Sequence, residues 1–211
     1  MGNQEKCIII SAGSMKRDIT ERLAFNDNDL VIACDGGYDS CIKYGIKPNI
    51  IIGDFDSIKS PLPDDTKRIT LKCEKDDTDT VSAIKYAFEN GYKNIVLTGA
   101  LGGRLDHTLA NLQALLCINS NGGRGKIIGD NEEITLICNE SITLKCDKTK
   151  TLSIFTPDEK AQGVTISGAK YILDNYDMSN NFPIGVSNEF VESDVVISVT
   201  KGRLFIMLTD K

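Results

Sequence analysis

The sequence predicts an α/β protein of two domains, in which a mostly parallel sheet covered by helices is followed by an antiparallel β-sandwich. Two observations favour this fold class. Short apolar runs alternate with segments of helical spacing as far as about residue 130. From there to residue 211 we find only short alternating runs with turn residues between them. We therefore expect one domain over residues 1–130 and a second over residues 131–211.

The expected strands of the first domain are Cys7–Ile10, Leu30–Ala33, Ile50–Ile52, Ile69–Leu71, Ile95–Leu97 and Ile127–Ile128. Because strands that alternate with helices pair in parallel and carry helices on their faces, the sequence predicts a Rossmann-like, three-layer domain. In the second domain the expected strands are Ile142–Cys146, Leu152–Ile154, Val164–Ile166, Val195–Val199 and Leu204–Leu208. Such short strands are typical of a small antiparallel sandwich.

Helices are predicted over residues 77–90 and 104–120. Asp77 or Thr78 can cap the first of them, and Gly91 suits the position after its last turn. The expected buried face of the second helix is a stripe of leucines, Leu105, Leu109, Leu112 and Leu116.

Charge and composition exclude several classes of protein. The formal net charge of −6 argues against a general surface for nucleic acid, but a nucleotide can still be held locally. No apolar run approaches the roughly 20 residues that span a bilayer, and the N-terminus does not resemble a signal peptide. Seven cysteines with no C-x-x-C pair and one histidine indicate reduced thiols rather than a zinc site. We expect a cytoplasmic protein with no membrane or nucleic-acid partner.

Carboxylates and glycines follow four of the predicted strands. The motifs are Asp35-Gly36-Gly37, Gly53-Asp54-Phe55-Asp56-Ser57, Lys75-Asp76-Asp77-Thr78-Asp79, and the segment from Gly99 to His107. Because parallel α/β sheets bind ligands beyond the carboxyl ends of their strands, these motifs predict one ligand site along one edge of the sheet.

The acidic motifs predict a magnesium site. In an extended segment Asp54 and Asp56 point to the same side, so both can reach one hard cation. Taken alone, such a pair is more often an acidic surface turn, and the neighbouring motifs favour the metal. The aspartates at 76, 77 and 79 can cap a helix, but their mutual repulsion also favours a shared cation. Asp79 is the best candidate ligand among them.

The glycine-rich loop before the second helix predicts a phosphate site, because backbone N–H groups at a helix start suit an anion. The chain contains no Walker A motif. Arg104 either clamps phosphate oxygens or forms a surface salt bridge. Asp106 is a candidate metal ligand or proton acceptor, and His107 either binds the ligand or makes a hydrogen bond at the helix start.

Taken together in this order, the motifs resemble those of the thiamine pyrophosphokinase family. The segments Gly168–Leu173 and Gly185–Glu189 also fit, so the resemblance covers most of the chain. It implies transfer of the pyrophosphoryl group of ATP to the hydroxyl of thiamine, which gives thiamine diphosphate and AMP. It also implies a homodimer with active sites at the subunit interface.

The resemblance further implies the roles of individual residues. Asp54, Asp56 and Asp79 would hold one or two Mg²⁺ ions, and Arg104 and Asp106 would complete the catalytic set. The implied ATP-binding residues are Asp35, Gly36, Asp77, Thr98, Gly102, Arg104 and His107. The implied thiamine-binding residues are Ser187 and Asn188, facing the α/β domain of the partner chain, together with Phe205.

Phe205 marks a departure from the family. Animal and fungal members stack a tryptophan near the C-terminus on thiamine, whereas this chain has no Trp. Phe205 lies where that residue is expected, and a core position in its strand is an equally good interpretation.

Two other functions remain as alternatives. A magnesium-dependent phosphohydrolase would use the same acidic cluster with water as the acceptor, and a regulatory module would bind ATP without turnover. The Ser187-Asn188 element favours the kinase, because a hydrolase needs no acceptor site. In the kinase we expect in-line attack at the β-phosphorus, with either Asp79 or Asp106 accepting the proton.

Overall fold

The computed structural model describes residues 5–71 and 77–211. The chain divides into two compact units, Met1–Asp130 and Asn131–Lys211, and each is described by itself. Lys75 and Asp76 of the third acidic motif lie outside the described residues, as does Cys73.

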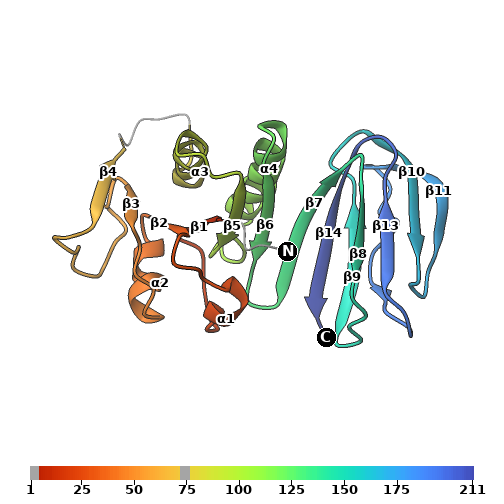
Figure 1. The fold of residues 1–211 in the computed structure, drawn as a ribbon, viewed down its shortest axis with the longest axis horizontal. Coiled ribbons are helices and arrows are strands. Elements are labelled where there is room, and N and C mark those ends of the chain that lie inside the picture. Colours follow the sequence, from red (N-terminus) through yellow and green to blue (C-terminus); the bar gives the residue numbers. More distant parts are fainter. Residues whose placement is uncertain (1–4, 72–76) are drawn as a thin grey trace. The chain divides into compact units, whose positions relative to one another are not determined.

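The first unit contains a sheet of six parallel strands (Figure 1). In spatial order they are β6 (Arg124–Ile128), β5 (Asn94–Thr98), β1 (Cys7–Ile10), β2 (Leu30–Cys34), β3 (Ile50–Gly53) and β4 (Lys67–Thr70). The chain builds outward from β1 to β4 and then returns to place β5 on the other side of β1. The strand order therefore reverses between β1 and β5, which is where parallel α/β sheets bind ligands.

Helices cover both faces of this sheet and confirm the predicted three layers (Figure 1). They are α1 (Thr20–Leu23), α2 (Gly37–Lys43), α3 (Asp79–Glu89) and α4 (Leu105–Ser120). Thr78 caps α3 as predicted, because its side-chain oxygen accepts the N–H of Val81 at 3.2 Å.

The predicted buried face of α4 was wrong. Leu105 and Leu109 are 72% and 54% exposed. The buried residues of this helix are Asn111, Ala114, Leu115 and Ile118. Gly125 in β6 explains the choice, since a Cβ there would lie 2.8 Å from the Leu115 side chain and 3.1 Å from that of Ile118. Because Gly125 leaves space for these two side chains, α4 packs with their face against the sheet.

The second unit is an antiparallel sandwich, as predicted. One of its layers contains β7 (Glu132–Cys138), β14 (Arg203–Asp210), β9 (Lys150–Phe155) and β12 (Asn188–Glu189). The other contains β8 (Ser141–Leu144), β13 (Val195–Ser198), β10 (Lys160–Ser167) and β11 (Leu173–Ser179). Residues 131–211 are all described and form no helix. The sequence analysis missed β7, β11 and β12.

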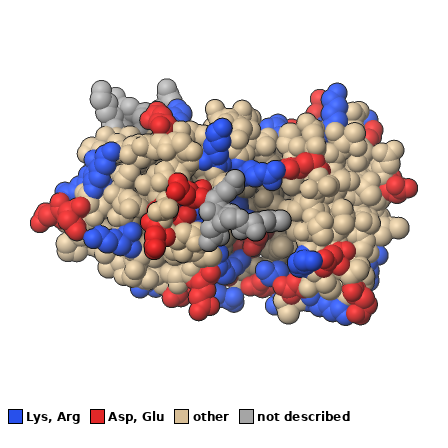
Figure 2. Space-filling view, in the orientation of Figure 1, with Lys and Arg blue, Asp and Glu red and all other residues tan. Residues whose placement is uncertain are grey.

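The surface in view mixes the two signs of charge. Figure 2 shows acidic and basic side chains interspersed over that face of the described residues, with no continuous basic area. None of the helices in residues 5–71 and 77–211 combines the length and the apolar character needed to cross a bilayer. The cysteines within these ranges are free thiols.

Gly37 provides a test of how closely α2 approaches the sheet. A Cβ at Gly37 would lie 2.1 Å from the carbonyl oxygen of Ile10, so we expect Gly37→Ala to lower the free energy of unfolding by about 3 kcal/mol. The matched control is Gly45→Ala, where φ is +65° and nothing lies within 4 Å. We expect this variant to lower the free energy of unfolding by about 1 kcal/mol, because a residue with a Cβ disfavours the left-handed backbone. Urea denaturation of both variants measures the difference, and equal losses would contradict the proposed contact.

Candidate active site

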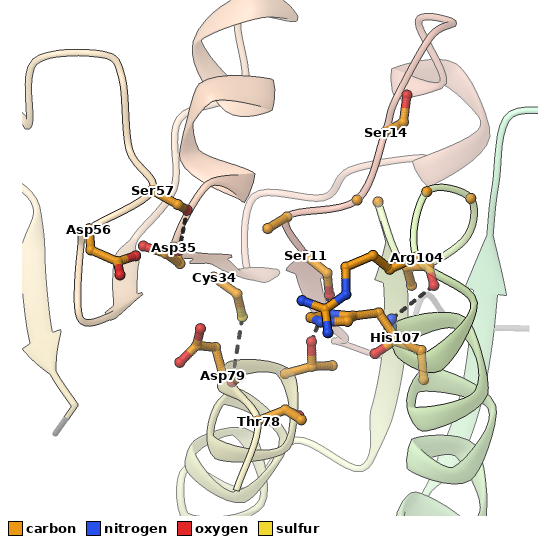
Figure 3. Close-up of a pocket in the computed structure, with 18 residues that line it drawn as sticks. Ser11, Ser14, Cys34, Asp35, Asp56, Ser57, Thr78, Asp79, Arg104 and His107 are labelled. Atoms are coloured by element: carbon orange, nitrogen blue, oxygen red, sulfur yellow. Dashed lines mark hydrogen bonds between the residues drawn. The ribbon is translucent and has the colours of Figure 1, made fainter. Parts of the chain in front are cut away.

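A pocket of about 570 Å³ lies at the carboxyl ends of β1, β2, β3 and β5 (Figure 3). Its lining comes from the segment after each of these strands, from Cys34 at the end of β2, from the start of α3 and from α4. The pocket therefore lies where the strand order reverses, and at the edge of the sheet that the polar motifs predicted.

Three carboxylates meet at one side of this pocket. Oxygens of Asp35, Asp54 and Asp56 lie within 4.8 Å of one another. The charge of Asp54 raises the pKa of Asp56, which shows that the two carboxylates repel. Asp35 is 8% exposed; its Oδ2 accepts a hydrogen bond from the Ser57 hydroxyl. Its buried Oδ1 has no hydrogen-bond partner among the described residues.

This donor set fits a hard cation. A buried carboxylate oxygen without a partner is costly, and a neighbouring pair of carboxylates adds repulsion. Magnesium binds carboxylate oxygens and would relieve both costs. The sequence analysis assigned Asp35 to ATP, whereas the structure groups it with Asp54 and Asp56.

The backbone brings Asp54 and Asp56 together in a way that the sequence analysis did not expect. The segment is not extended, because Phe55 has a left-handed φ of +67°. The N–H of Asp56 donates to Oδ1 of Asp54 at 3.3 Å. The Phe55 side chain packs against the core around β1 and β2, and this contact helps to fix an uncommon conformation.

Asp79 is the first residue of α3 and lines the same pocket. Figure 3 shows its carboxylate facing the side of the pocket where Asp35 and Asp56 lie. It is not one of the three carboxylates grouped within 4.8 Å. A buried contact of 2.9 Å between the hydroxyls of Ser11 and Thr80 ties the start of α3 to the end of β1.

The glycine-rich loop leads into α4 with two left-handed residues, Gly102 and Gly103. Arg104 and His107 line the pocket beyond it, on the side away from Asp35 and Asp56 in Figure 3. Arg104 forms a two-point ion pair with Asp106, at 3.1 Å and 2.6 Å, and both side chains are exposed. Asp106 also accepts the N–H of His107 at 3.0 Å.

The ion pair sets the protonation of Asp106. The hydrogen bond from Arg104 holds the pKa of Asp106 below its ordinary value. Asp106 itself is not among the residues that line the pocket. The predicted surface salt bridge of Arg104 is therefore confirmed, while its clamp on phosphate oxygens stays a prediction.

Three of the predicted ATP-binding residues, Gly36, Thr98 and Asp77, are not among the residues that line the pocket. Gly36 precedes α2, and a Cβ there would come within 2.9 Å of the Ser57 hydroxyl. Thr98 is fully buried and its carbonyl accepts the N–H of Ser11 at 2.8 Å. Asp77 forms an ion pair of 2.5 Å with Lys85.

The sequence analysis missed the segment Ser11–Ser14, which follows β1 and lines the pocket. Its Gly13 donates to the carbonyl of Gly99 at 2.8 Å, and a Cβ on Gly13 would lie 2.3 Å from that oxygen. The available signal was the same as at the other strand ends, small and polar residues directly after an apolar run. Asn111, deep in α4, also lines the pocket and carried no such signal.

The predicted thiamine-binding residues lie in the second unit. Ser187 is exposed and has a left-handed φ of +57°. Asn188 is 2% exposed; its Oδ1 accepts the N–H groups of Tyr171 and Glu189, and its Nδ2 donates to the carbonyl of Tyr171 at 2.7 Å. Its amide therefore holds backbone in place.

Phe205 is buried in β14. Its neighbours Leu204 and Ile206 belong to the sandwich core. Since successive side chains of a strand point to opposite faces, the side chain of Phe205 lies on the other face of its sheet.

Comparison with known proteins identifies both units. The family model "Thiamin pyrophosphokinase, catalytic domain" matches residues 22–124, and "Thiamin pyrophosphokinase, vitamin B1 binding domain" matches residues 139–204. Thiamine pyrophosphokinase from Bacillus subtilis is 30% identical over 212 residues, which cover 96% of this chain and 98% of the relative. Thiamin pyrophosphokinase 1 from Caenorhabditis elegans is 27% identical, over 82% of this chain and 76% of that protein.

Solved structures agree with these matches. The crystal structure of the Bacillus subtilis enzyme superposes with a TM-score of 0.89 at 25% identity, covering 98% of this chain and all of that one. The structure of thiamin pyrophosphokinase from Geobacillus thermodenitrificans gives a TM-score of 0.82 at 26% identity, with 97% of each chain covered.

The acidic cluster predicts how stability responds to magnesium and pH. Since the folded protein raises the pKa of Asp56, its ionised form opposes folding above that pKa, and protonation at lower pH relieves the cost. Asp54→Asn should remove this cost and leave the metal-free melting temperature equal or higher. Magnesium at about 100 times its Kd should stabilise the wild type by roughly 2.7 kcal/mol and the variant much less. Thermal melts with EDTA or MgCl₂ measure this, and an equal magnesium response in both proteins would contradict it.

Proposed function

Because the chain belongs to the thiamine pyrophosphokinase family, we propose that the pocket of its first unit holds ATP with magnesium and that its second unit holds thiamine. The chain transfers the pyrophosphoryl group of ATP to the hydroxyl of thiamine, which gives thiamine diphosphate and AMP. One observation carries the placement of ATP. The pocket has carboxylates at one side and Arg104 with His107 at the other.

Asp54, Asp56 and Asp79 are the proposed magnesium ligands, and we add Asp35 to them. The spacing of the first two with Asp35 and the unpartnered Oδ1 of Asp35 support a set that can hold one or two ions. When bound, magnesium neutralises the phosphate charge and orients the triphosphate.

Arg104 supplies the cation at the other side of the pocket. Its planar guanidinium can form two parallel hydrogen bonds to phosphate oxygens. Because its pair with Asp106 is exposed, exchanging that partner for phosphate costs little. The left-handed Gly102 and the helix start near His107 provide further N–H donors for an anion.

Gly36, Asp77 and Thr98 act on the ATP site indirectly in this proposal. Gly36 leaves room for Ser57, and Thr98 fixes the segment after β1 through its carbonyl. Asp77 contributes negative charge just before the start of α3, and it forms an ion pair with Lys85 there.

The thiamine hydroxyl attacks the β-phosphorus in line with the leaving AMP. An alcohol of ordinary basicity is not ionised at neutral pH, so its proton leaves late in the reaction. We favour Asp79 as the acceptor because it lines the pocket. Asp106 is the weaker candidate, because it is not among the residues that line the pocket.

Ser187, Asn188 and Phe205 form the proposed thiamine site of the second unit. Ser187 is exposed and can contact the ligand, while Asn188 shapes the site by holding Tyr171. Phe205 is the candidate aromatic wall, because it lies on the sheet face away from the sandwich core.

We propose a homodimer in which the ATP pocket of one copy meets the thiamine site of its partner. Exposed apolar side chains support this arrangement, since such patches mark interaction surfaces. Leu105 and Leu109 are exposed beside Arg104 on α4. Tyr171, Ile172 and Val186 are exposed around the Asn188 turn. We place the protein in the cytoplasm, where the free thiols of its described cysteines would remain reduced.

Incubation with ATP, Mg²⁺ and thiamine tests the function. We expect AMP and thiamine diphosphate in equal amounts, and only when all three components are present. Asp54→Asn and Asp56→Asn should lower turnover by about two to three orders of magnitude without unfolding the protein, because each removes a metal ligand. Asp64→Asn is the matched control, since Asp64 is fully exposed and pairs only loosely with Arg68 at 3.7 Å.

The same assay separates the alternatives. AMP or phosphate release without thiamine would indicate a hydrolase. Magnesium-dependent ATP binding without any AMP would indicate a regulatory module. Near-native turnover in a folded Asp54→Asn, Asp56→Asn double variant would contradict the metal assignment.

Mixing two defective variants tests the interface site. Asp54→Asn damages the ATP pocket, and Ser187→Tyr fills the thiamine site. If each active site combines the two units from different copies, random reassembly should restore about one quarter of the sites. Coexpression followed by the thiamine assay measures this recovery, with light scattering to establish the dimer. A dimer without recovery would place both halves of a site in one chain.

A further inference from the structure

Asp39 makes a set of contacts that none of the proposed roles uses. It lies in the first turn of α2, four residues after Asp35. Its carboxylate accepts the N–H of Ser60 at 2.8 Å and the N–H of Lys59 at 3.1 Å and 3.3 Å. A single side chain thus holds two consecutive backbone amides of the loop that follows Asp54 and Asp56.

Two neighbours of Asp39 hold the same loop. Asp35 accepts a hydrogen bond from the Ser57 hydroxyl, and the Tyr38 hydroxyl donates to the carbonyl of Pro61 at 3.4 Å. Tyr38 and Asp39 are consecutive residues in the first turn of α2, and Asp35 lies just before the helix with a left-handed φ of +45°. The start of α2 therefore anchors the loop over residues 57–61.

The loop needs such anchors because of its backbone. Phe55 adopts a left-handed φ of +67°, a conformation that costs free energy in a residue other than glycine. The carboxylates of Asp54 and Asp56 also repel each other, which favours spreading of the loop. If the loop populated other conformations, metal affinity would fall in proportion to the fraction that keeps the carboxylates together.

We propose that Asp39 is a positioning residue that sets the metal affinity of the acidic cluster by holding the Lys59 and Ser60 amides. This inference rests on the proposed assignment of magnesium to Asp35, Asp54 and Asp56. Asp39 acts through the loop, because its carboxylate oxygens are engaged by backbone N–H groups.

The protonation state of Asp39 agrees with this role. Hydrogen bonds from the Ser60 side chain and from the Lys59 and Ser60 amides hold its pKa below the ordinary range. The carboxylate is therefore ionised at neutral pH, and hydrogen bonds to an ionised acceptor are stronger than neutral ones.

Binding of Mn²⁺ to the nucleotide-free protein, followed by electron paramagnetic resonance, tests the proposal. Asp39→Ala should weaken Mn²⁺ binding about tenfold, as expected when a group that orients metal ligands is removed. Asp39→Asn keeps one acceptor oxygen but loses the charge, so its affinity should lie between those of the wild type and Asp39→Ala. In turnover, Asp39→Ala should need about tenfold more Mg²⁺ for half-maximal rate, with an unchanged KM for thiamine.

Asp29 provides the matched control. Its carboxylate also accepts two backbone N–H groups, from Lys6 at 3.0 Å and Asn26 at 2.9 Å. Asp29 lies just before β2, at the amino ends of the strands, whereas the pocket lies at their carboxyl ends. It is 7% exposed, so Asp29→Asn should destabilise the fold at least as much as Asp39→Ala. Mn²⁺ affinity in Asp29→Asn should nevertheless equal that of the wild type.

Each outcome separates this inference from the proposed function. Wild-type affinity in Asp39→Ala would overturn the role of Asp39 and leave the metal site intact. An equal loss in Asp29→Asn would assign the effect to general destabilisation and also overturn it. No Mn²⁺ binding by the wild type would overturn the metal assignment itself. If Asp39→Ala does not fold, unchanged affinity in Asp39→Asn overturns the inference.

Discussion

Repulsion between carboxylates at the ends of β2 and β3 is the constraint on which this structure depends. Asp35, Asp54 and Asp56 bring oxygens within 4.8 Å of one another, and the raised pKa of Asp56 records the cost. The loop after β3 is held in place against this repulsion by the packing of Phe55 and by the hydrogen bonds that its backbone donates to Asp39 at the start of α2. In the proposed function a divalent cation balances this repulsion, and ATP carries one with it.

Parallel strands make it possible to place opposite charges on two sides of one pocket. Because every strand of the first unit points the same way, the segments after β2, β3 and β5 meet at one edge. The carboxylates lie in the segments after β2 and β3, and Arg104 lies in the loop after β5. A triphosphate with its metal needs both kinds of group, since negative charge must be neutralised on each side of the bond that breaks.

The second unit serves the reaction in a different way. Asn188 looks like a ligand-binding amide in the sequence, but its side chain makes hydrogen bonds to the backbone of Tyr171 and Glu189. The residue shapes a turn and leaves Ser187 exposed beside it. In the proposed thiamine site, Asn188 therefore shapes the turn, and Ser187 is the residue that can contact the ligand.

The sequence by itself determined the six strands of the first unit, the change of architecture near residue 130 and the edge of the sheet that carries the candidate site. These follow from local periodicity and from the position of polar residues after apolar runs, which are properties of consecutive residues. Only the tertiary structure decided which face of α4 is buried, that Phe55 turns left-handed, and that Asp35 joins Asp54 and Asp56. Those outcomes depend on neighbours distant in sequence, such as Gly125 beneath α4, and local patterns contain no information about such contacts.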